Sequence, residues 1–226
     1  KGIPLVDASG ARQAFPSLTM STYASKGAVV SPLVLANQEH HVSIDAPDIS
    51  AAENSMRAIV STPEFDQGAG IAAWSMRGAT MRDVAIHNTL SYARELGKKL
   101  QQAIENKTDP GKAVKEYLQG WILFRGRIVS VDEQTQGGFD VGRVVLSGDN
   151  SEQVWIYNQN ENLIAWNTNR SLPLAMGPDL ICYLTADGQP FSNADLQLAK
   201  DKDVVIIGAK TKPESRAPSI VNAFLT

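Results

Sequence analysis

Turn residues divide the first fifth of the chain into short extended pieces. Within residues 1–47, the segment 29–35 collects apolar side chains that we expect to be buried. The pieces are too few to form a core alone. The residues that separate them are Gly10, Pro16, Gly27 and Pro32.

Helical spacing of apolar residues begins after these pieces. Ser50 and Glu53 have the spacing of a capping box, and apolar positions follow three and four residues apart, which predicts a helix over residues 50–61. Residues 70–76 and 80–87 then have the character of two strands.

Two further helices are predicted. One begins near Thr89, with apolar and charged side chains on opposite faces. The dipeptide Asp109-Pro110 combines an N-cap residue with proline at the first helical position, which predicts a helix over residues 110–119.

Beyond Gly120 the pattern changes to short apolar runs separated by glycine-containing turns. This is typical of successive antiparallel strands. The predicted fold class is therefore α+β, with a β-rich C-terminal half. The turns are Gly137-Gly138, Gly148-Asp149-Asn150 and Asp187-Gly188.

Composition narrows the classes of protein. The chain has 226 residues, of which 43% are hydrophobic and 20% charged, which excludes a disordered chain. Its net charge of -3 lacks the basic excess of nucleic-acid binding proteins. Cys182 is the single cysteine, so no internal disulfide can form and a cytoplasmic location is expected. We find no apolar run of membrane-spanning length and no signal peptide, so no membrane partner is expected.

The first residues resemble the entry to a strand inside a domain, and no initiator methionine precedes them. We therefore expect the sequence to be a fragment of a longer protein. A fragment would leave part of the apolar run 29–35 uncovered, so we expect an oligomer or a chain that carries the missing part.

Standard enzyme motifs are absent, and no metal site is predicted. His41 and Asp45 would share one face of a strand, but at about 3.3 Å per residue they would lie roughly 13 Å apart. No motif identifies a cofactor, so the cofactor requirement is unknown from the sequence.

Three short patterns have chemical potential. Arg57, four residues after Glu53, could orient a substrate carboxylate, or the two could form a surface ion pair. Thr89 and Ser91 place hydroxyls at a helix N-terminus, where an anion or a carbonyl could bind, or which they could simply cap. The polar stretch 158–162 lies between apolar strand residues, and it either satisfies a turn or lines a polar cleft.

Eight groups of short segments along the chain, listed below, together resemble the S-methyl thiohydantoin desulfurase-like family. Members of that family are often encoded beside, or fused to, hydantoinase/oxoprolinase enzymes. The segments occur in the family's order over nearly the whole chain. The matching segments are Gly2-Ile3-Pro4-Leu5-Val6-Asp7-Ala8, Ala14-Phe15-Pro16, Glu53 to Arg57, Thr89-Leu90-Ser91 with Ala93 and Gly97, Phe124-Arg125-Gly126-Arg127-Ile128, Gly137-Gly138-Phe139 with Gly142, Gln159-Asn160-Glu161-Asn162-Leu163 and Pro178-Asp179-Leu180-Ile181.

The resemblance implies a longer protein, of which this chain is the later part. Residues 1–47 would be the remnant of a first α/β domain, and residues 48–226 a second, α+β domain. Family members are expected to act on hydantoin-like rings, and at least one hydrolyses an S-methyl thiohydantoin to a hydantoin and methanethiol. The site would lie between the two domains.

Two hypotheses follow. In the first, the protein is a hydrolase with Asp7 as base and Thr89 as oxyanion stabiliser, and with Ser91, Asn160, Glu161 and Arg57 binding the substrate. In the second, it is a non-catalytic subunit or ligand-binding partner of a hydantoinase/oxoprolinase-type enzyme. Family members tend to have Asp, Arg and Glu where this chain has uncharged side chains, which favours the second hypothesis. These positions are Ser9, Gln13 and Ser17.

Overall fold

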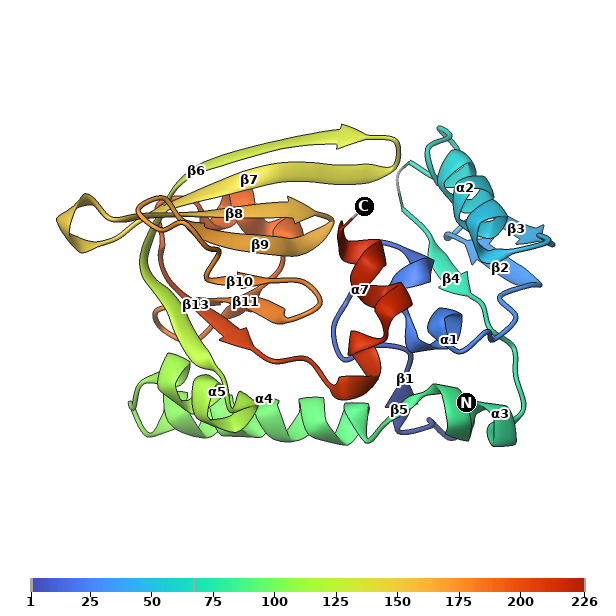
Figure 1. The fold of residues 1–226 in the computed structure, drawn as a ribbon, viewed down its shortest axis with the longest axis horizontal. Helices are drawn as coiled ribbons and strands as arrows, with labels where there is room; N and C mark the ends of the chain where they lie inside the picture. Colours follow the sequence, from blue (N-terminus) through green and yellow to red (C-terminus); the bar gives the residue numbers. More distant parts are fainter. Residues whose placement is uncertain (1, 67, 226) are drawn as a thin grey trace. The chain divides into compact units, whose positions relative to one another are not determined.

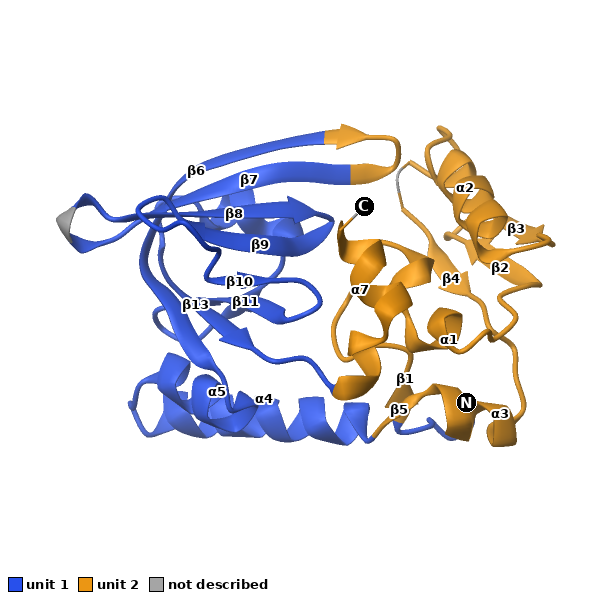
Figure 2. Ribbon diagram, in the orientation of Figure 1, with its two compact units in different colours: residues 1–7, 88–134, 140–212 blue, residues 8–87, 135–139, 213–226 orange. Residues whose placement is uncertain are grey.

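Helices and antiparallel sheets make up the structure, a computed structural model that describes residues 2–66 and 68–225, and the predicted α+β class is confirmed. The chain divides into two compact units (Figure 2). Unit 1 contains residues 1–7, 88–134 and 140–212, and unit 2 contains residues 8–87, 135–139 and 213–226. The domain boundary near residue 47, which the resemblance implies for a longer protein, stays a prediction.

The two predicted helices of unit 1 are present as α4 (Thr89–Glu105) and α5 (Pro110–Leu118). Asp109 caps α5 as expected, since its side chain accepts a hydrogen bond of 3.0 Å from the Lys112 amide. Both helices pack their apolar faces against one side of the sheet that follows (Figure 1).

That sheet has eight strands in the order β10-β9-β8-β7-β6-β13-β11-β12, and its registered pairs are antiparallel, as the alternating runs predict. A short helix, α6, and two 3-10 turns, η2 and η3, connect the strands. The bounds of these elements are β6 Trp121–Gln136, β7 Phe139–Ser147, η2 Asp149–Ser151, β8 Gln153–Gln159, β9 Glu161–Asn167, β10 Ala175–Met176, β11 Leu180–Thr185, β12 Pro190–Phe191, η3 Asn193–Asp195, α6 Leu196–Ala199 and β13 Asp203–Ala209.

The sheet curls, because β9 and β10 at one end of the order contact β11 near the other end. The main core lies inside the curl, where Val204 and Ile206 of β13 pack. Val205 and Ile207 point to the other side and pack under α4 and α5. Burial on both faces explains why β13 is an unbroken apolar run rather than an alternating one.

Unit 2 is built around the three-stranded sheet β3-β2-β4, and a second antiparallel pair joins β1 to β5. Helix α2 packs its apolar face on a core to which β2 and β3 of this three-stranded sheet contribute. The bounds of its elements are β1 Ala8–Ser9, η1 Leu18–Met20, α1 Thr22–Ser25, β2 Leu33–Ala36, β3 His41–Ile44, α2 Ile49–Val60, β4 Gly70–Ala72, α3 Gly78–Val84, β5 Ile86–His87, η4 Pro213–Arg216 and α7 Pro218–Leu225.

One local prediction in unit 2 is wrong, and a second is confirmed except at one residue. Most of the expected strand 80–87 is helix α3, since the Ala85 amide bonds the Met81 carbonyl at 2.9 Å, and only Ile86 and His87 pair as a strand. In the apolar run 29–35, Val30, Leu33 and Leu35 are buried as expected, but Val29, which precedes β2, is 74% exposed. Among the described residues, no helix combines the length and apolar character needed to cross a membrane.

Candidate functional site

A distant carboxylate caps the start of α4. Asn88 precedes the helix in a left-handed conformation, with φ of 60°, and its own side chain makes no capping bond. Asp7 takes this role: its Oδ1 accepts hydrogen bonds from the amides of Leu90 at 2.9 Å and Ser91 at 3.0 Å, and its Oδ2 from the Ser91 hydroxyl. The structure therefore brings together two predicted site residues that lie 84 positions apart in the chain.

These hydrogen bonds stabilise the ionised form of Asp7. The Ser91 hydroxyl, followed by the Ser91 amide, lowers the pKa of the Asp7 carboxyl below its ordinary value, and the Leu90 amide adds to the effect. A carboxylate with a lowered pKa takes up a proton less readily. The role of Asp7 as a catalytic base stays a prediction, and the contacts assign it a structural role as well.

Thr89 is the first residue of α4, next to this cap. Its hydroxyl oxygen is shielded from solvent and has no hydrogen-bond partner among the described residues. Asp7 already occupies the amides of Leu90 and Ser91, whereas the Thr89 hydroxyl beside them is unengaged among the described residues. Its role as an oxyanion stabiliser stays a prediction.

The turn between β8 and β9 positions Asn160. The register pairs Gln159 with Glu161, so Asn160 forms the turn, with φ of 55°. Its amide and its side-chain Oδ1 both bond the backbone of Asp140 on β7, each at 2.7 Å, and its carbonyl accepts a 2.7 Å bond from the side chain of Asn193. Asn160 thus joins three segments of unit 1.

Glu161 is the neighbour with a free carboxylate. Its side chain is partly buried and makes no hydrogen bond or ion pair among the described residues. Burial raises the pKa of Glu161 above its ordinary value. A raised pKa moves a carboxyl toward the range in which it can both accept and return a proton.

Arg57 lies in unit 2 and is fully engaged there. Its Nε bonds Glu53 at 2.7 Å, one terminal nitrogen bonds the Gly138 carbonyl at 2.6 Å, and the other bonds the carbonyl of Pro16. Its guanidinium carbon lies 3.4 Å from the ring centre of Phe139. These bonds leave little of the guanidinium for a substrate carboxylate, whose binding by Arg57 stays a prediction.

Glu53 is not part of a capping box, contrary to the sequence prediction. The N-cap of α2 is Asp48, whose side chain accepts a 2.8 Å bond from the Ala51 amide. The Glu53 carboxylate instead faces inward and accepts a 2.7 Å bond from the Leu18 amide while it pairs with Arg57. The pair connects α2 with η1 and is buried, whereas the sequence analysis had offered a surface ion pair as one alternative.

Sequence reasoning singled out the polar stretch 158–162 but missed two polar groups of unit 1 that accompany it, Glu133 and Tyr183. Glu133 on β6 bonds the buried side chain of Asn158, and the hydroxyl of Tyr183 on β11 is buried without a partner among the described residues. The signal was present in β8, where Asn158 continues the buried alternation of Val154 and Ile156. Such an amide in a core register indicates a polar network or a ligand.

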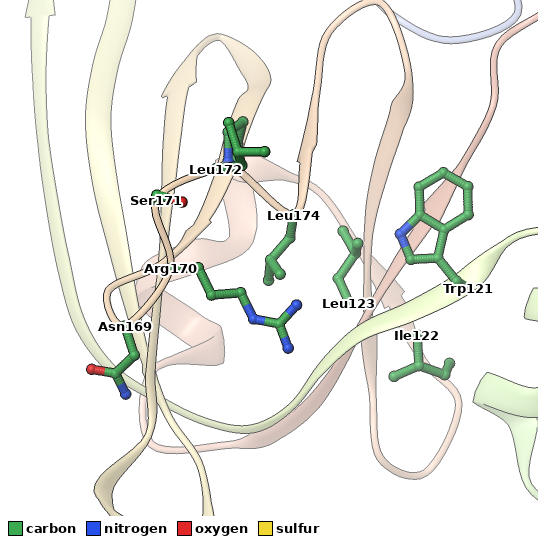
Figure 3. A pocket seen from close by; sticks show the side chains of 9 residues that line it. Trp121, Ile122, Leu123, Asn169, Arg170, Ser171, Leu172 and Leu174 are labelled. Atoms are coloured by element: carbon green, nitrogen blue, oxygen red, sulfur yellow. The ribbon is translucent and has the colours of Figure 1, made fainter.

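Surface cavities lie elsewhere on unit 1. Figure 3 shows the side chains that line a cavity of about 640 Å³, among them Trp121, Leu174 and the guanidinium of Arg170. None of the predicted site residues lines it. Within residues 2–66 and 68–225, no three His, Cys, Asp or Glu side chains are grouped so that they could hold a metal ion.

A family model described as S-Me-THD-like, C-terminal domain, matches residues 47–223. No curated protein matches the sequence. The crystal structure of a protein from Chromobacterium violaceum superposes with a TM-score of 0.80 at 29% sequence identity, over 99% of this chain and 63% of that one. The chain therefore spans less than two thirds of that protein's length. Because the family model covers more than half of the chain, the protein belongs to the S-Me-THD-like family, which confirms the resemblance seen in the sequence.

Proposed function

We propose that this chain is part of a hydrolase that acts on a hydantoin or S-methyl thiohydantoin ring, with Glu161 as its acid-base group. One observation supports this assignment most: Glu161 is a partly buried carboxylate without a partner among the described residues, and burial alone raises its pKa. Family membership supplies the class of substrate.

The proposed reaction replaces sulfur by oxygen at C2 of the ring. Glu161 takes a proton from a water molecule as the water oxygen forms a bond to C2. As the water oxygen adds, the electrons of the C2–N double bond move onto the ring nitrogen. The C2–S bond then breaks, the carboxyl of Glu161 returns its proton to the departing sulfur, and the proton of the hydroxyl on C2 passes to the ring nitrogen as the carbonyl forms. Methanethiol and a hydantoin are the products, so atoms balance without an oxidant or a reductant.

The other candidates take supporting roles in this proposal. The free Thr89 hydroxyl would donate to the oxygen that gains charge on C2. Asp7 and Ser91 would hold the first turn of α4 in place through their mutual hydrogen bonds. Asn160 would fix the turn from which Glu161 projects, and Arg57 would maintain the structure of unit 2.

The experiment is a thiol-release assay on the natural protein that contains this sequence. With S-methyl thiohydantoin as substrate, Glu161→Gln should lower kcat by roughly 100-fold or more, the range expected for loss of an acid-base group. Binding of hydantoin, measured by calorimetry, should change little. The matched control Glu116→Gln, on the exposed side of α5, should alter neither quantity. Unchanged kcat in Glu161→Gln would contradict the assignment.

The second candidate function is a ligand-binding or structural subunit without turnover. It is favoured by the engagement of Asp7, Asn160 and Arg57 in hydrogen bonds that serve the fold. Exposed apolar side chains, such as Ile3 at 83% and Leu5 at 87%, are compatible with a partner chain or a second copy. Hydantoin binding without thiol release would support this alternative, and neither binding nor release would contradict both.

A further inference from the structure

Four polar side chains face the interior of the curled sheet of unit 1. They come from different strands: Glu133 from β6, Asn158 from β8, Asn162 from β9 and Tyr183 from β11. Two of them are almost completely buried, with Asn158 only 2% exposed and Tyr183 only 5%. Polar groups at such depth are costly unless each finds a partner.

The nitrogen atoms of both amides have partners, and these partners fix how the amides are turned. The Nδ2 of Asn158 donates to Glu133 Oε1 at 2.7 Å, and that of Asn162 donates to the Ile181 carbonyl at 3.0 Å. A carboxylate and a carbonyl only accept, so the two amides cannot be reversed without losing these bonds. Their Oδ1 atoms therefore point away from these partners.

The oxygen atoms of the group are the ones left without partners. Among the described residues, neither Oδ1 of Asn158 and Asn162 nor the hydroxyl of Tyr183 takes part in a hydrogen bond, and all three oxygens are shielded from solvent. The carboxylate of Glu133 forms no ion pair with a Lys or Arg of the described chain. The group is thus rich in oxygen acceptors and lacks a positive charge.

Strand register, hydrogen bonds and electrostatics place these side chains near one another. Asn158 lies opposite Asn162 in the strand register. The Ile181 carbonyl that Asn162 binds lies two positions before Tyr183 on the same strand. Burial first, and then the nearby charge of Glu133, raise the pKa of the Tyr183 hydroxyl. Gly142 leaves room for Glu133, since a Cβ there would lie 2.5 Å from Glu133 Cγ.

Oxygen ligands around an unpaired carboxylate are the preferred surroundings of a hard cation. A single carboxylate balances one positive charge, and a divalent ion would keep an uncompensated charge in the interior.

We propose that Glu133, Asn158, Asn162 and Tyr183 form a binding site for one monovalent metal cation, Na⁺ or K⁺, inside the sheet of unit 1. The ion accepts electron density from the two amide oxygens and the phenol oxygen, and it neutralises the Glu133 carboxylate. It stabilises the folded sheet and is independent of the proposed ring chemistry.

The test is thermal unfolding in NaCl, KCl and choline chloride at equal ionic strength. Choline serves as the control because it is too large for the interior. NaCl or KCl should raise the melting temperature in a saturable way, by roughly 3–6 °C at ten times the apparent Kd. Equal melting temperatures in the three salts would overturn the proposal. The same rise in CaCl2 at far lower concentration would overturn the assignment of a monovalent ion.

Matched variants separate this site from general salt effects. Glu133→Gln should abolish the rise, whereas Glu152→Gln should keep it. Glu152 also bonds a buried asparagine, Asn167, but the Oδ1 of that residue is satisfied by the Asn169 amide at 2.9 Å. If Glu133→Gln fails to fold, Asn162→Leu should raise the apparent Kd at least tenfold, and an unchanged Kd would overturn the proposal.

Discussion

Removing the positive charge from the buried Arg57–Glu53 pair should destabilise unit 2 strongly. The side chains of the pair are 15% and 10% exposed and lie 2.6 Å apart. Arg57→Met keeps most of the aliphatic stem but leaves the Glu53 carboxylate with the Leu18 amide as its one remaining partner among the described residues. It also removes the donors from two backbone carbonyls, those of Gly138 and Pro16.

The expected cost follows from burial. Breaking a buried ion pair by removing one partner costs about 3–5 kcal/mol, because a charge is left uncompensated. For a chain of this size, that corresponds to a fall in melting temperature of roughly 6–20 °C. Arg57→Lys should lie between wild type and Arg57→Met, since a single ammonium keeps the charge but not the planar set of donors.

An exposed pair of the same length provides the control. Lys98 and Glu95 on α4 also lie 2.6 Å apart, but both side chains are 48% exposed. Lys98→Met should therefore cost about 0–1 kcal/mol. The assay is equilibrium unfolding in urea, followed by circular dichroism, on all variants. If Arg57→Met costs no more than Lys98→Met, burial does not determine the strength of the pair and the reasoning is refuted.

Three further predictions concern site residues. Asp7→Ala should lower the melting temperature by roughly 1–8 °C through loss of the α4 cap. Because the pKa of Asp7 in the folded protein is lowered from 3.8, the difference in melting temperature should have its full size above about pH 4 and shrink as the pH falls further. Thermal melts from pH 2 to 7 measure it. Glu161→Gln should have the same melting temperature as wild type below about pH 4 and a higher one at pH 7, because the raised pKa of Glu161 means that its ionisation opposes folding above 4.5. A variant less stable than wild type at pH 7 would count against this. Asn160→Ala should cost about 1–3 kcal/mol in urea unfolding, and Asn160→Gly, which tolerates the positive φ, should recover part of that.

Elements with local signals could be predicted from the sequence. The helix over 110–118 has its cap, its proline and its apolar face within a few residues, and the structure confirms it. The helix from Thr89 was predicted from its two faces alone. The prediction of a strand over residues 80–87 was wrong. These residues have mixed propensity, and the segment is too short for its hydrophobic pattern to distinguish the two-residue period of a strand from the 3.6-residue period of a helix.

Contacts between residues far apart in the chain could not be predicted from the sequence. Glu53 has the spacing of a capping residue, and only the fold brings the Leu18 amide, 35 positions away, to its carboxylate. The partner of Asp7 is likewise 84 positions away. Polar residues in local motifs therefore have two possible uses, and the sequence alone leaves the choice between them open.

The candidate site residues divide by whether the fold already uses their polar atoms. The polar atoms of Asp7, Asn160 and Arg57 form a helix cap, a turn and a buried ion pair. Substitutions at these residues should therefore lower the stability of the fold. Glu161 and Thr89 have polar atoms that serve no contact among the described residues, and burying such atoms lowers stability. A functional role is most strongly indicated for a group that destabilises the fold and makes no stabilising contact in return. For this reason we propose Glu161 rather than Asp7 as the acid-base group, although the sequence analysis gave Asp7 the role of base.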